Sequence, residues 1–171
     1  MFQSAPPTIQ EYFLRPGYIY LTREPTLIST VLGSCVAVTL WDKKLELGGI
    51  NHFLFPMVNE PREATARYGN VAMNALIRLF LEEGSRKDAL EAQIFGGACL
   101  PDSSREAQQV GEDNVSIGRE ILGRNGIPII SEDIGGTRGR KLIFNSLTNE
   151  VVILRVDRLR ESDWYPYRDN R

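Results

Sequence analysis

Cys35 and His52 are the residues of this chain whose types and spacing could do covalent chemistry. Cys35 lies in the stretch GSCVAV, and His52, the sole histidine of the sequence, lies in GGINHF, 52 − 35 = 17 residues later. A free thiol has a pKa of about 8.5 and is mostly protonated at neutral pH. A neighbouring imidazole can take that proton, let the sulfur attack an acyl carbon, and then protonate the leaving group. The pair therefore indicates a cysteine nucleophile with its own general base.

The strands that carry the two residues decide whether they meet. We expect strands over 35–41 and 49–55, joined by a turn near Lys43-Lys44. In an antiparallel hairpin the numbers of paired residues have a constant sum, which is 87 for a two-residue loop at 43–44. Because 35 + 52 = 87, such a loop would place Cys35 directly opposite His52. A four-residue loop makes the sum 89 and leaves them diagonal on one face, and an odd loop puts them on opposite faces.

Further groups near the cysteine could complete such a site. The hydroxyl of Ser29 or of Thr30 could accept a hydrogen bond from one ring nitrogen. Backbone N–H groups from Gly33 to Cys35 could stabilise an oxyanion, since glycine permits the tight turn. Two other interpretations compete: a buried cysteine that serves only packing, and a redox pair of Cys35 with Cys99.

The composition limits the class of protein. A length of 171 residues fits one domain, and 42% hydrophobic with 25% charged residues is typical of a globular protein. The net charge of −2 argues against a general nucleic-acid binder. Two cysteines make no disulfide framework and favour a reducing, cytoplasmic location. No signal peptide or membrane insertion is expected, and the sequence offers no metal cluster or cofactor motif.

The predicted elements group strands at both ends of the chain, which is typical of an α+β fold. Apolar spacing predicts one helix from residue 68 to Gly84 and another over 113–124, with 101–109 as an exposed loop. We expect residues 1–15 to form a flexible arm, 16–158 the domain, and 159–171 a tail. The expected strands cover 18–21, 28–31, 35–41, 49–55, 92–95, 127–131, 141–145 and 150–156.

Six stretches in order resemble one known family. The chain is similar to the CheD family of chemoreceptor glutamine deamidases over roughly residues 18–156. The matching stretches are TVLGSCVAV from Thr30, GGINHF from Gly48, RYG from Arg67 with Ala72-Met73, FGGA from Phe95, Asn114, and DIGG from Asp133 followed by Gly139-Arg140-Lys141.

The resemblance implies a fold and a set of site residues. The fold would be stacked mixed β-sheets with two main helices on one face, related to the catalytic domain of cytotoxic necrotizing factor. Cys35 matches the nucleophile and His52 the base; the family's threonine position falls on Ser29, with Thr30 adjacent, so either could orient the ring. Oxyanion or substrate-binding positions would be Gly33, Ser34, Asn51, Phe95, Gly96 and Gly97.

The resemblance also implies a reaction and partners. Hydrolysis of receptor glutamine side chains to glutamate would proceed through a thioester and need no cofactor, and hydrolysis of glutamyl methyl esters could pass through the same acyl-enzyme. The partners would be the cytoplasmic helices of chemoreceptors and a CheC-type phosphatase. Arg138, Arg140 and Lys141 could meet acidic receptor surface or form a solvated turn. The alternative is a catalytically weak adaptor that binds receptors or the phosphatase.

Overall fold

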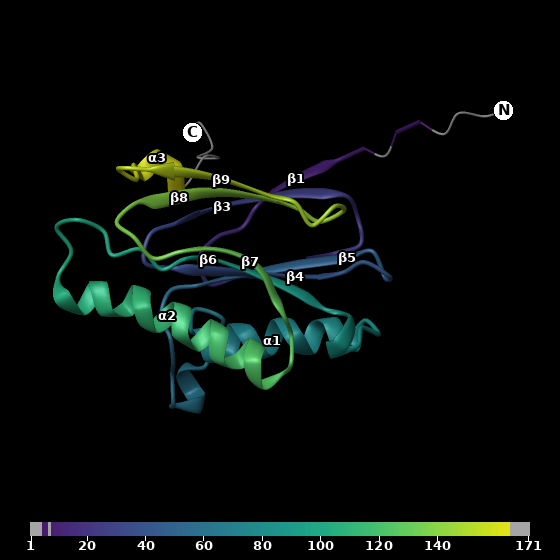
Figure 1. Ribbon diagram of the computed structural model, residues 1–171, viewed down its shortest axis with the longest axis horizontal. Helices are drawn as coiled ribbons and strands as arrows, with labels where there is room; N and C mark the ends of the chain where they lie inside the picture. The colour runs from purple at the N-terminus through teal and green to yellow at the C-terminus, as the bar shows by residue number, and fades with distance from the viewer. Residues whose placement is uncertain (1–4, 7, 165–171) are drawn as a thin grey trace.

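Three layers make up the molecule in the computed structural model, which describes residues 5–6 and 8–164 (Figure 1). Within these residues, one sheet holds four strands in the order β1-β3-β8-β9, and a second holds five in the order β2-β5-β4-β6-β7. The strands are β1 (Gln10–Phe13), β2 (Ile19–Thr22), β3 (Thr26–Leu32), β4 (Val36–Asp42), β5 (Leu47–Phe53), β6 (Glu91–Gly96), β7 (Ile129–Ile134), β8 (Gly139–Asn145) and β9 (Val151–Val156).

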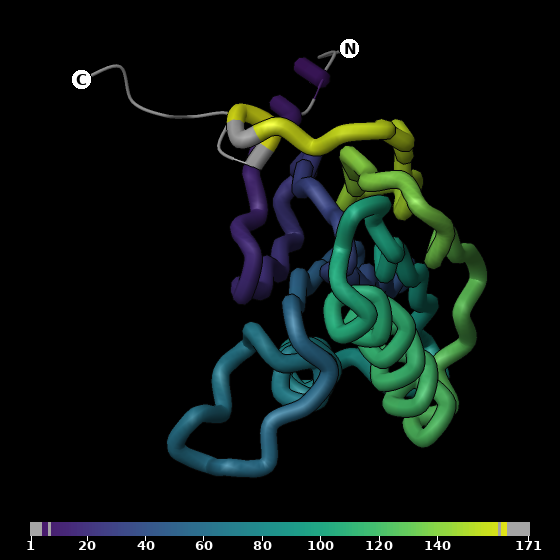
Figure 2. The backbone as a smooth tube through the Cα atoms, turned by 90° about the vertical axis from the view of Figure 1, so that its left-hand side faces the viewer, coloured from purple at the N-terminus to yellow at the C-terminus, as the bar shows by residue number. Residues whose placement is uncertain are grey.

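The third layer consists of two long helices on the outer face of the five-stranded sheet (Figures 1 and 2). They are α1 (Gly69–Glu82) and α2 (Arg105–Arg124); a short α3 (Glu161–Trp164) and the 3-10 turns η1 (Pro61–Glu63) and η2 (Lys87–Ala89) complete the set. Both sheets are mixed, because β1 runs parallel to β3 and β6 parallel to β7 while the other pairs are antiparallel. The expected α+β architecture, with stacked mixed sheets and two main helices on one face, is confirmed.

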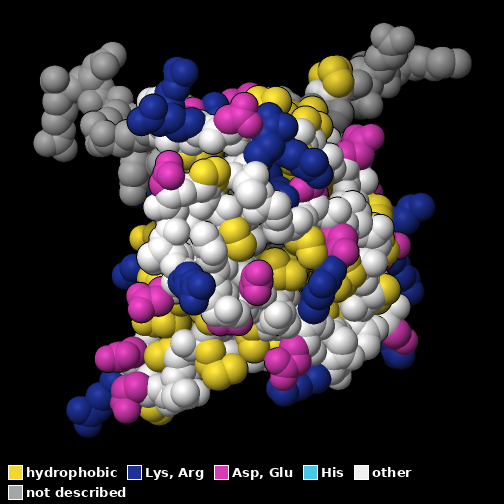
Figure 3. Space-filling view, turned by 60° about the vertical axis from the view of Figure 1, so that its left-hand side comes forward, with side chains coloured by type: hydrophobic (Ala, Val, Ile, Leu, Met, Phe, Trp, Pro, Cys, Tyr) yellow, Lys and Arg dark blue, Asp and Glu magenta, His cyan; other side chains and the backbone are white. Residues whose placement is uncertain are grey.

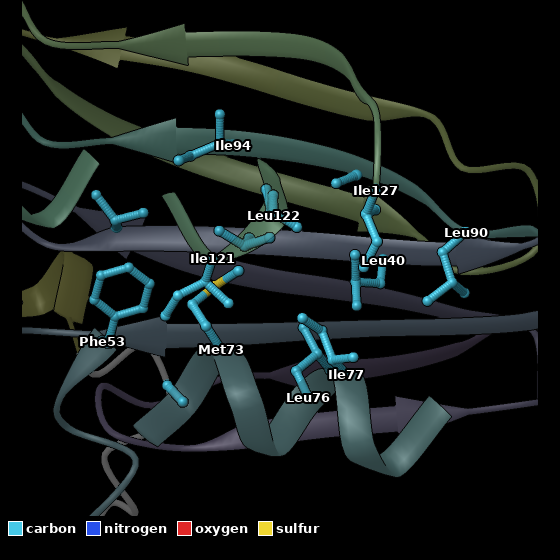
Figure 4. Close-up of a cluster of buried hydrophobic side chains, with 14 of the residues drawn as sticks. Leu40, Phe53, Met73, Leu76, Ile77, Leu90, Ile94, Ile121, Leu122 and Ile127 are labelled. Atoms are coloured by element: carbon cyan, nitrogen blue, oxygen red, sulfur yellow. The ribbon is translucent and has the colours of Figure 1, made fainter. Parts of the chain in front are cut away.

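Two apolar cores separate the layers. The larger fills the space between the five-stranded sheet and the helices, where Leu40, Phe53 and Met73 meet (Figure 4). The second lies between the sheets and includes Ile50 and Phe95. β5 is covered on both faces, so all seven of its residues are buried and its sequence lacks the alternation of a half-exposed strand.

The loop between β4 and β5 sets the register on which the site depends. Asp42 ends β4, and its Oδ1 accepts hydrogen bonds from the backbone N–H groups of Lys44 at 3.0 Å and Leu45 at 3.1 Å. The loop spans residues 43–46, and Ala37 pairs with His52, so paired numbers sum to 89. The four-residue alternative is therefore the one that the chain adopts.

The second helix begins earlier than predicted. We expected a loop over 101–109, but α2 starts at Arg105, and the Ser104 hydroxyl caps it by accepting from the N–H of Ala107 at 3.2 Å. The first turns are exposed and polar, so they carry no apolar periodicity. A serine before good helix formers was the signal that could have located this start.

The expected flexible arm is wrong for residues 10–14. Residues Gln10–Phe13 form β1 against β3, and Leu14 is fully buried between the sheets. At the other end, residues 165–171 of the expected tail lie outside the described residues. Within residues 5–6 and 8–164, no helix has the length and apolarity that crossing a membrane requires.

One glycine lets α2 lie close to the sheet. A Cβ at Gly111 would lie 2.8 Å from the carbonyl oxygen of Gly97 and 2.9 Å from that of Ala98, whereas a Cβ at Gly123 would meet nothing within 4 Å. The contacts at Gly111 are with backbone, which cannot yield without moving the helix.

We expect Gly111→Ala to lower the free energy of unfolding by about 1–3 kcal/mol through this overlap. Gly123→Ala, on the same helix, should raise it by up to about 1 kcal/mol because alanine favours the helix. Urea unfolding of both variants checks the contrast. Equal shifts for the two would show that α2 is not held close at Gly111.

Candidate active site

Cys35 and His52 share the face of the sheet that looks into the layer between the two sheets. His52 pairs with Ala37 across the β4–β5 ladder, and directly paired residues point to the same face. Cys35 directly precedes β4 and lies on the same side of the sheet, because it packs against the core between the sheets. His52 is fully buried, while Cys35 is half-buried and packs against the inter-sheet core. The structure thus brings the two predicted residues to one side of one hairpin.

Thr30 fixes the protonation pattern of the imidazole. Its Oγ1 lies 2.8 Å from His52 Nδ1 and 2.8 Å from the carbonyl oxygen of Leu14. A hydroxyl has one hydrogen, and a carbonyl can only accept, so Thr30 donates to Leu14 and accepts from Nδ1–H of His52. Nε2 therefore keeps its lone pair, and this buried atom has no hydrogen-bond partner among the described residues. An imidazole in this state can take a proton.

Ser29, the other predicted orienting residue, does not reach the ring. Adjacent residues of a strand point to opposite faces, so Ser29 faces away from the layer into which Thr30 projects. It contributes through its backbone instead, since its carbonyl oxygen accepts from the N–H of Leu14 at 2.8 Å. This bond holds the segment whose own carbonyl receives the Thr30 hydroxyl.

Burial keeps both members of the pair uncharged. Desolvation raises the pKa of the Cys35 thiol to about 11, against a smaller lowering by its own backbone N–H. Desolvation also lowers the pKa of His52 to about 3. At neutral pH the pair accordingly rests as thiol and neutral imidazole rather than as thiolate and imidazolium.

Three glycines predicted to bind an oxyanion or substrate support the turn that carries Cys35. The N–H of Gly97 donates to the carbonyl oxygen of Cys35 at 2.8 Å, and the carbonyl oxygen of Gly33 accepts from Ala98 at 3.0 Å. Gly96 has φ +104, and a Cβ there would lie 2.2 Å from the Cys35 carbonyl oxygen. These bonds fasten the end of β6 to the turn, so the N–H of Gly97 is already engaged.

Two other candidates, Asn51 and Phe95, lie on opposite faces of the five-stranded sheet. Asn51 is on the helix-facing side of β5, where its Oδ1 accepts from the N–H of Val38 at 3.0 Å and its Nδ2 lies 3.4 Å from the Met73 sulfur. Phe95 is 2% exposed and fills the inter-sheet core. Asn51 thus points away from the pair, whereas Phe95 shares its face, because both Phe95 and His52 pair with Ala37. The predicted substrate contacts of both stay predictions. Ser34 is half-buried beside Cys35, and its predicted role stays a prediction.

The basic turn, for which receptor contact and a solvated turn were the two alternatives, is partly structural. Arg140 is 3% exposed and pairs with Asp133 at 2.8 Å, and Lys141 pairs with Asp163 at 2.6 Å. Arg138 remains on the surface with Asp157 as its partner.

Charges of both signs are interspersed on one face of the molecule, where no histidine is visible (Figure 3). In the described part of the chain, no cluster of three or more His, Cys, Asp or Glu could hold a metal ion.

Two contributors to the site had no predicted role. The Leu14 carbonyl is a backbone group, and nothing in a side-chain pattern indicates it. Asn114 of α2 is fully buried, and its Nδ2 donates to the carbonyl oxygens of Ser34 at 3.0 Å and Leu54 at 2.9 Å. A polar residue on the apolar face of a helix was the available signal for Asn114.

Comparison with known proteins supports one family. The family model described as CheD chemotactic sensory transduction matches residues 55–155, more than half of the chain. A probable chemoreceptor glutamine deamidase CheD of Trichlorobacter lovleyi is 43% identical over 145 residues, covering 85% of this chain and 90% of that protein. A probable chemoreceptor glutamine deamidase CheD 1 of Anaeromyxobacter dehalogenans is 44% identical over 135 residues, covering 79% and 78% respectively.

A solved structure of Bacillus licheniformis hypothetical protein YfiH superposes with a TM-score of 0.46 at 17% identity, covering 67% of this chain and 49% of that one. A likeness of this size carries no argument about fold or function. The sequence identity with the two CheD proteins extends over most of each chain and shows the family. The chain belongs to the CheD family.

Proposed function

We propose that this protein hydrolyses the side-chain amide of glutamine residues in chemoreceptors, with Cys35 as nucleophile and His52 as general base. The observation that carries the proposal is the Thr30–His52 hydrogen bond, which leaves Nε2 of a buried imidazole unprotonated on the face that Cys35 shares. The substrate class comes from the names of the relatives, which are described as probable chemoreceptor glutamine deamidases.

The reaction proceeds in two halves. As the Cys35 sulfur bonds to the amide carbon, the thiol proton passes to Nε2 of His52. The imidazolium then gives that proton to the departing nitrogen, ammonia leaves, and a thioester remains. Water next attacks the thioester while Nε2 takes one of its protons, and the returned proton restores the thiol as glutamate is released. Throughout, Nδ1–H stays bonded to Thr30.

The oxyanion donor that we propose is the backbone N–H of Cys35. This group belongs to the same residue as the sulfur, and its interaction with the thiol lowers the thiol pKa. A donor in that place can stabilise the negative oxygen that forms when the sulfur adds to the amide. The adjacent Ser34 is half-buried and lies at the same turn. We assign the oxyanion role to the turn at 34–35 rather than to Gly97.

The neutral resting pair suits a nucleophile that must avoid side reactions. A thiol with a pKa near 11 contains little thiolate at neutral pH, so it reacts slowly with general electrophiles. Proton transfer to His52 then accompanies attack on a bound amide, when developing charge is stabilised by the site. A glutamyl methyl ester would form the same acyl-enzyme, because the Cys35 thiol can attack its carbonyl carbon and methanol then leaves in place of ammonia.

The adaptor alternative has lost its sequence support. It rested on a serine at the family's threonine position, but the hydroxyl that meets the ring belongs to Thr30. Docking to a CheC-type phosphatase is compatible with catalysis and remains a proposal. Activity in the cytoplasm without a cofactor, and the relation of the fold to cytotoxic necrotizing factor, likewise stay predictions.

Replacement of the nucleophile tests the function directly. Purified receptor incubated with the wild-type protein should gain about one dalton for each converted glutamine, read by peptide mass spectrometry. Cys35→Ala should abolish this gain, while Cys99→Ala should retain it, because the Cys99 thiol donates to the carbonyl oxygen of Gln108 and has no part in the proposed reaction. Unchanged receptor peptides with the folded wild-type protein would refute the enzymatic assignment.

The orienting hydroxyl is tested by a pair of neighbouring substitutions. Thr30→Val keeps the shape but leaves Nδ1–H unpaired, and we expect kcat/KM to fall by roughly 100-fold because the base loses its tautomer and orientation. Thr30→Ser should keep most activity, and Ser29→Ala should stay within a few-fold of wild type. Steady-state kinetics on receptor substrate decide between the two sites. A larger loss in Ser29→Ala would reverse the assignment.

The resting charge state is tested by titration. In a Cys99→Ala background, the ultraviolet absorbance of the Cys35 thiolate should emerge only as pH approaches about 11, since burial disfavours the anion. His52→Gln should leave that titration nearly unchanged, because neutral imidazole holds no charge to stabilise a thiolate. A thiolate signal near neutral pH that disappears in His52→Gln would instead indicate an ion pair.

A further inference from the structure

A buried amide on α2 ties together the two chain segments that carry the reacting side chains. Asn114 is fully buried, and its Nδ2 donates both of its hydrogens, one to the Ser34 carbonyl oxygen at 3.0 Å and one to the Leu54 carbonyl oxygen at 2.9 Å. Resting on the hydrolysis proposed above, we propose that Asn114 is a positioning residue that holds Cys35 and His52 in reacting register.

The link made by Asn114 lies at the end of the β4–β5 hairpin that carries the two side chains, where the strands are no longer paired. The β4–β5 ladder ends at the pair Val36–Phe53, so beyond that pair no ladder bond joins the two strands. Ser34 directly precedes Cys35, and Leu54 follows His52 by two residues. The amide of Asn114 therefore joins the two strands just beyond the end of their own pairing, beside Cys35 and two residues from His52. Its two hydrogen bonds link the strands at a point where the ladder itself has none.

The helix can deliver this amide because its backbone lies against the support of the cysteine turn. Gly111, one helical turn before Asn114, would place a Cβ 2.8 Å from the Gly97 carbonyl oxygen. The N–H of Gly97 in turn donates to the Cys35 carbonyl oxygen, and the N–H of Ala98 donates to that of Gly33. Residues 97–98 are thus held between α2 and the turn at 33–35, and Asn114 adds a direct bond to the same turn.

The chemistry of the position fits an amide in particular. Two carbonyl oxygens need two donors from one compact group, and an asparagine NH₂ supplies them, whereas aspartate would add only acceptors. The Oδ1 of Asn114 is meanwhile buried without a partner among the described residues. An unpaired buried carbonyl is costly and calls for an explanation, and precise placement of the neighbouring dyad supplies one.

A matched control is available on β6. Gln93 is 5% exposed, and its Nε2 also makes two bonds, to the backbone and side-chain oxygens of Asn149 at 2.8 and 2.9 Å. It lies opposite Thr39, three pairs along the ladder from Val36 and away from the cysteine turn. Gln93→Ala thus removes a comparable buried amide without touching the dyad.

The test compares Asn114→Ala with Gln93→Ala. Both should lower the urea midpoint, but only Asn114→Ala should reduce kcat, by about 10- to 100-fold with KM nearly unchanged, because small misplacement of reacting groups is costly. The iodoacetamide alkylation rate of Cys35, measured with Cys99→Ala present, should change several-fold in Asn114→Ala alone. Asn114→Ser, which can donate one hydrogen, should fall between wild type and Asn114→Ala and serves if the alanine variant does not fold.

The alkylation rate separates this inference from the function itself. If receptor deamidation fails in the wild type while Asn114→Ala still alters Cys35 alkylation, the hydrolysis proposal falls and the positional role stands. If Asn114→Ala and Gln93→Ala lower kcat equally, or if alkylation in Asn114→Ala (or in Asn114→Ser, where the alanine variant is unfolded) matches wild type, Asn114 is a structural residue and the inference is overturned.

Discussion

The site depends on the single hydrogen of the Thr30 hydroxyl. Because that hydrogen goes to the Leu14 carbonyl, the oxygen can only accept from the ring, and His52 must carry its proton on Nδ1. A carboxylate could impose the same tautomer, but it would bring a charge into a fully buried layer. The hydroxyl gives the direction without the charge, which is consistent with a ring whose pKa burial lowers to about 3.

The layered architecture explains why a single hydroxyl group, that of Thr30, is enough to orient the His52 ring. The helices cover the outer face of the five-stranded sheet and the second sheet covers its inner face, so β5 is buried along its whole length (Figure 1). His52 is fixed through its backbone as well, since its carbonyl oxygen accepts from Gly17 at 2.8 Å and its N–H donates to Tyr18 at 3.2 Å. With the main chain held on both edges, one side-chain bond determines the orientation of the ring.

The sequence placed Cys35 and His52 on neighbouring strands and located most of the strands, but it left the register of these two strands open. The parity of the β4–β5 loop rests on Asp42, whose carboxylate receives two backbone N–H groups. Such local bonds are visible only once the turn is formed. Asn51 neighbours His52 in sequence but points the other way, because adjacent strand residues face opposite layers. The choice between Ser29 and Thr30 likewise required the β3 face, and the Leu14 carbonyl had no sequence signal at all.

The edge strand β1 carries a consequence for the acid–base state of the ring. Leu14 directly follows β1, which is held by pairing with β3 and by stacking of Tyr12 on Tyr20 at 3.9 Å between ring centroids. If this edge were peeled away, the Thr30 hydroxyl would lose its acceptor and become free to donate to Nδ1. The ring proton would move to Nε2, and the imidazole would offer the thiol a donor where an acceptor is needed. A tag or fusion at the amino end that displaces β1 would therefore change which ring nitrogen of His52 carries the proton.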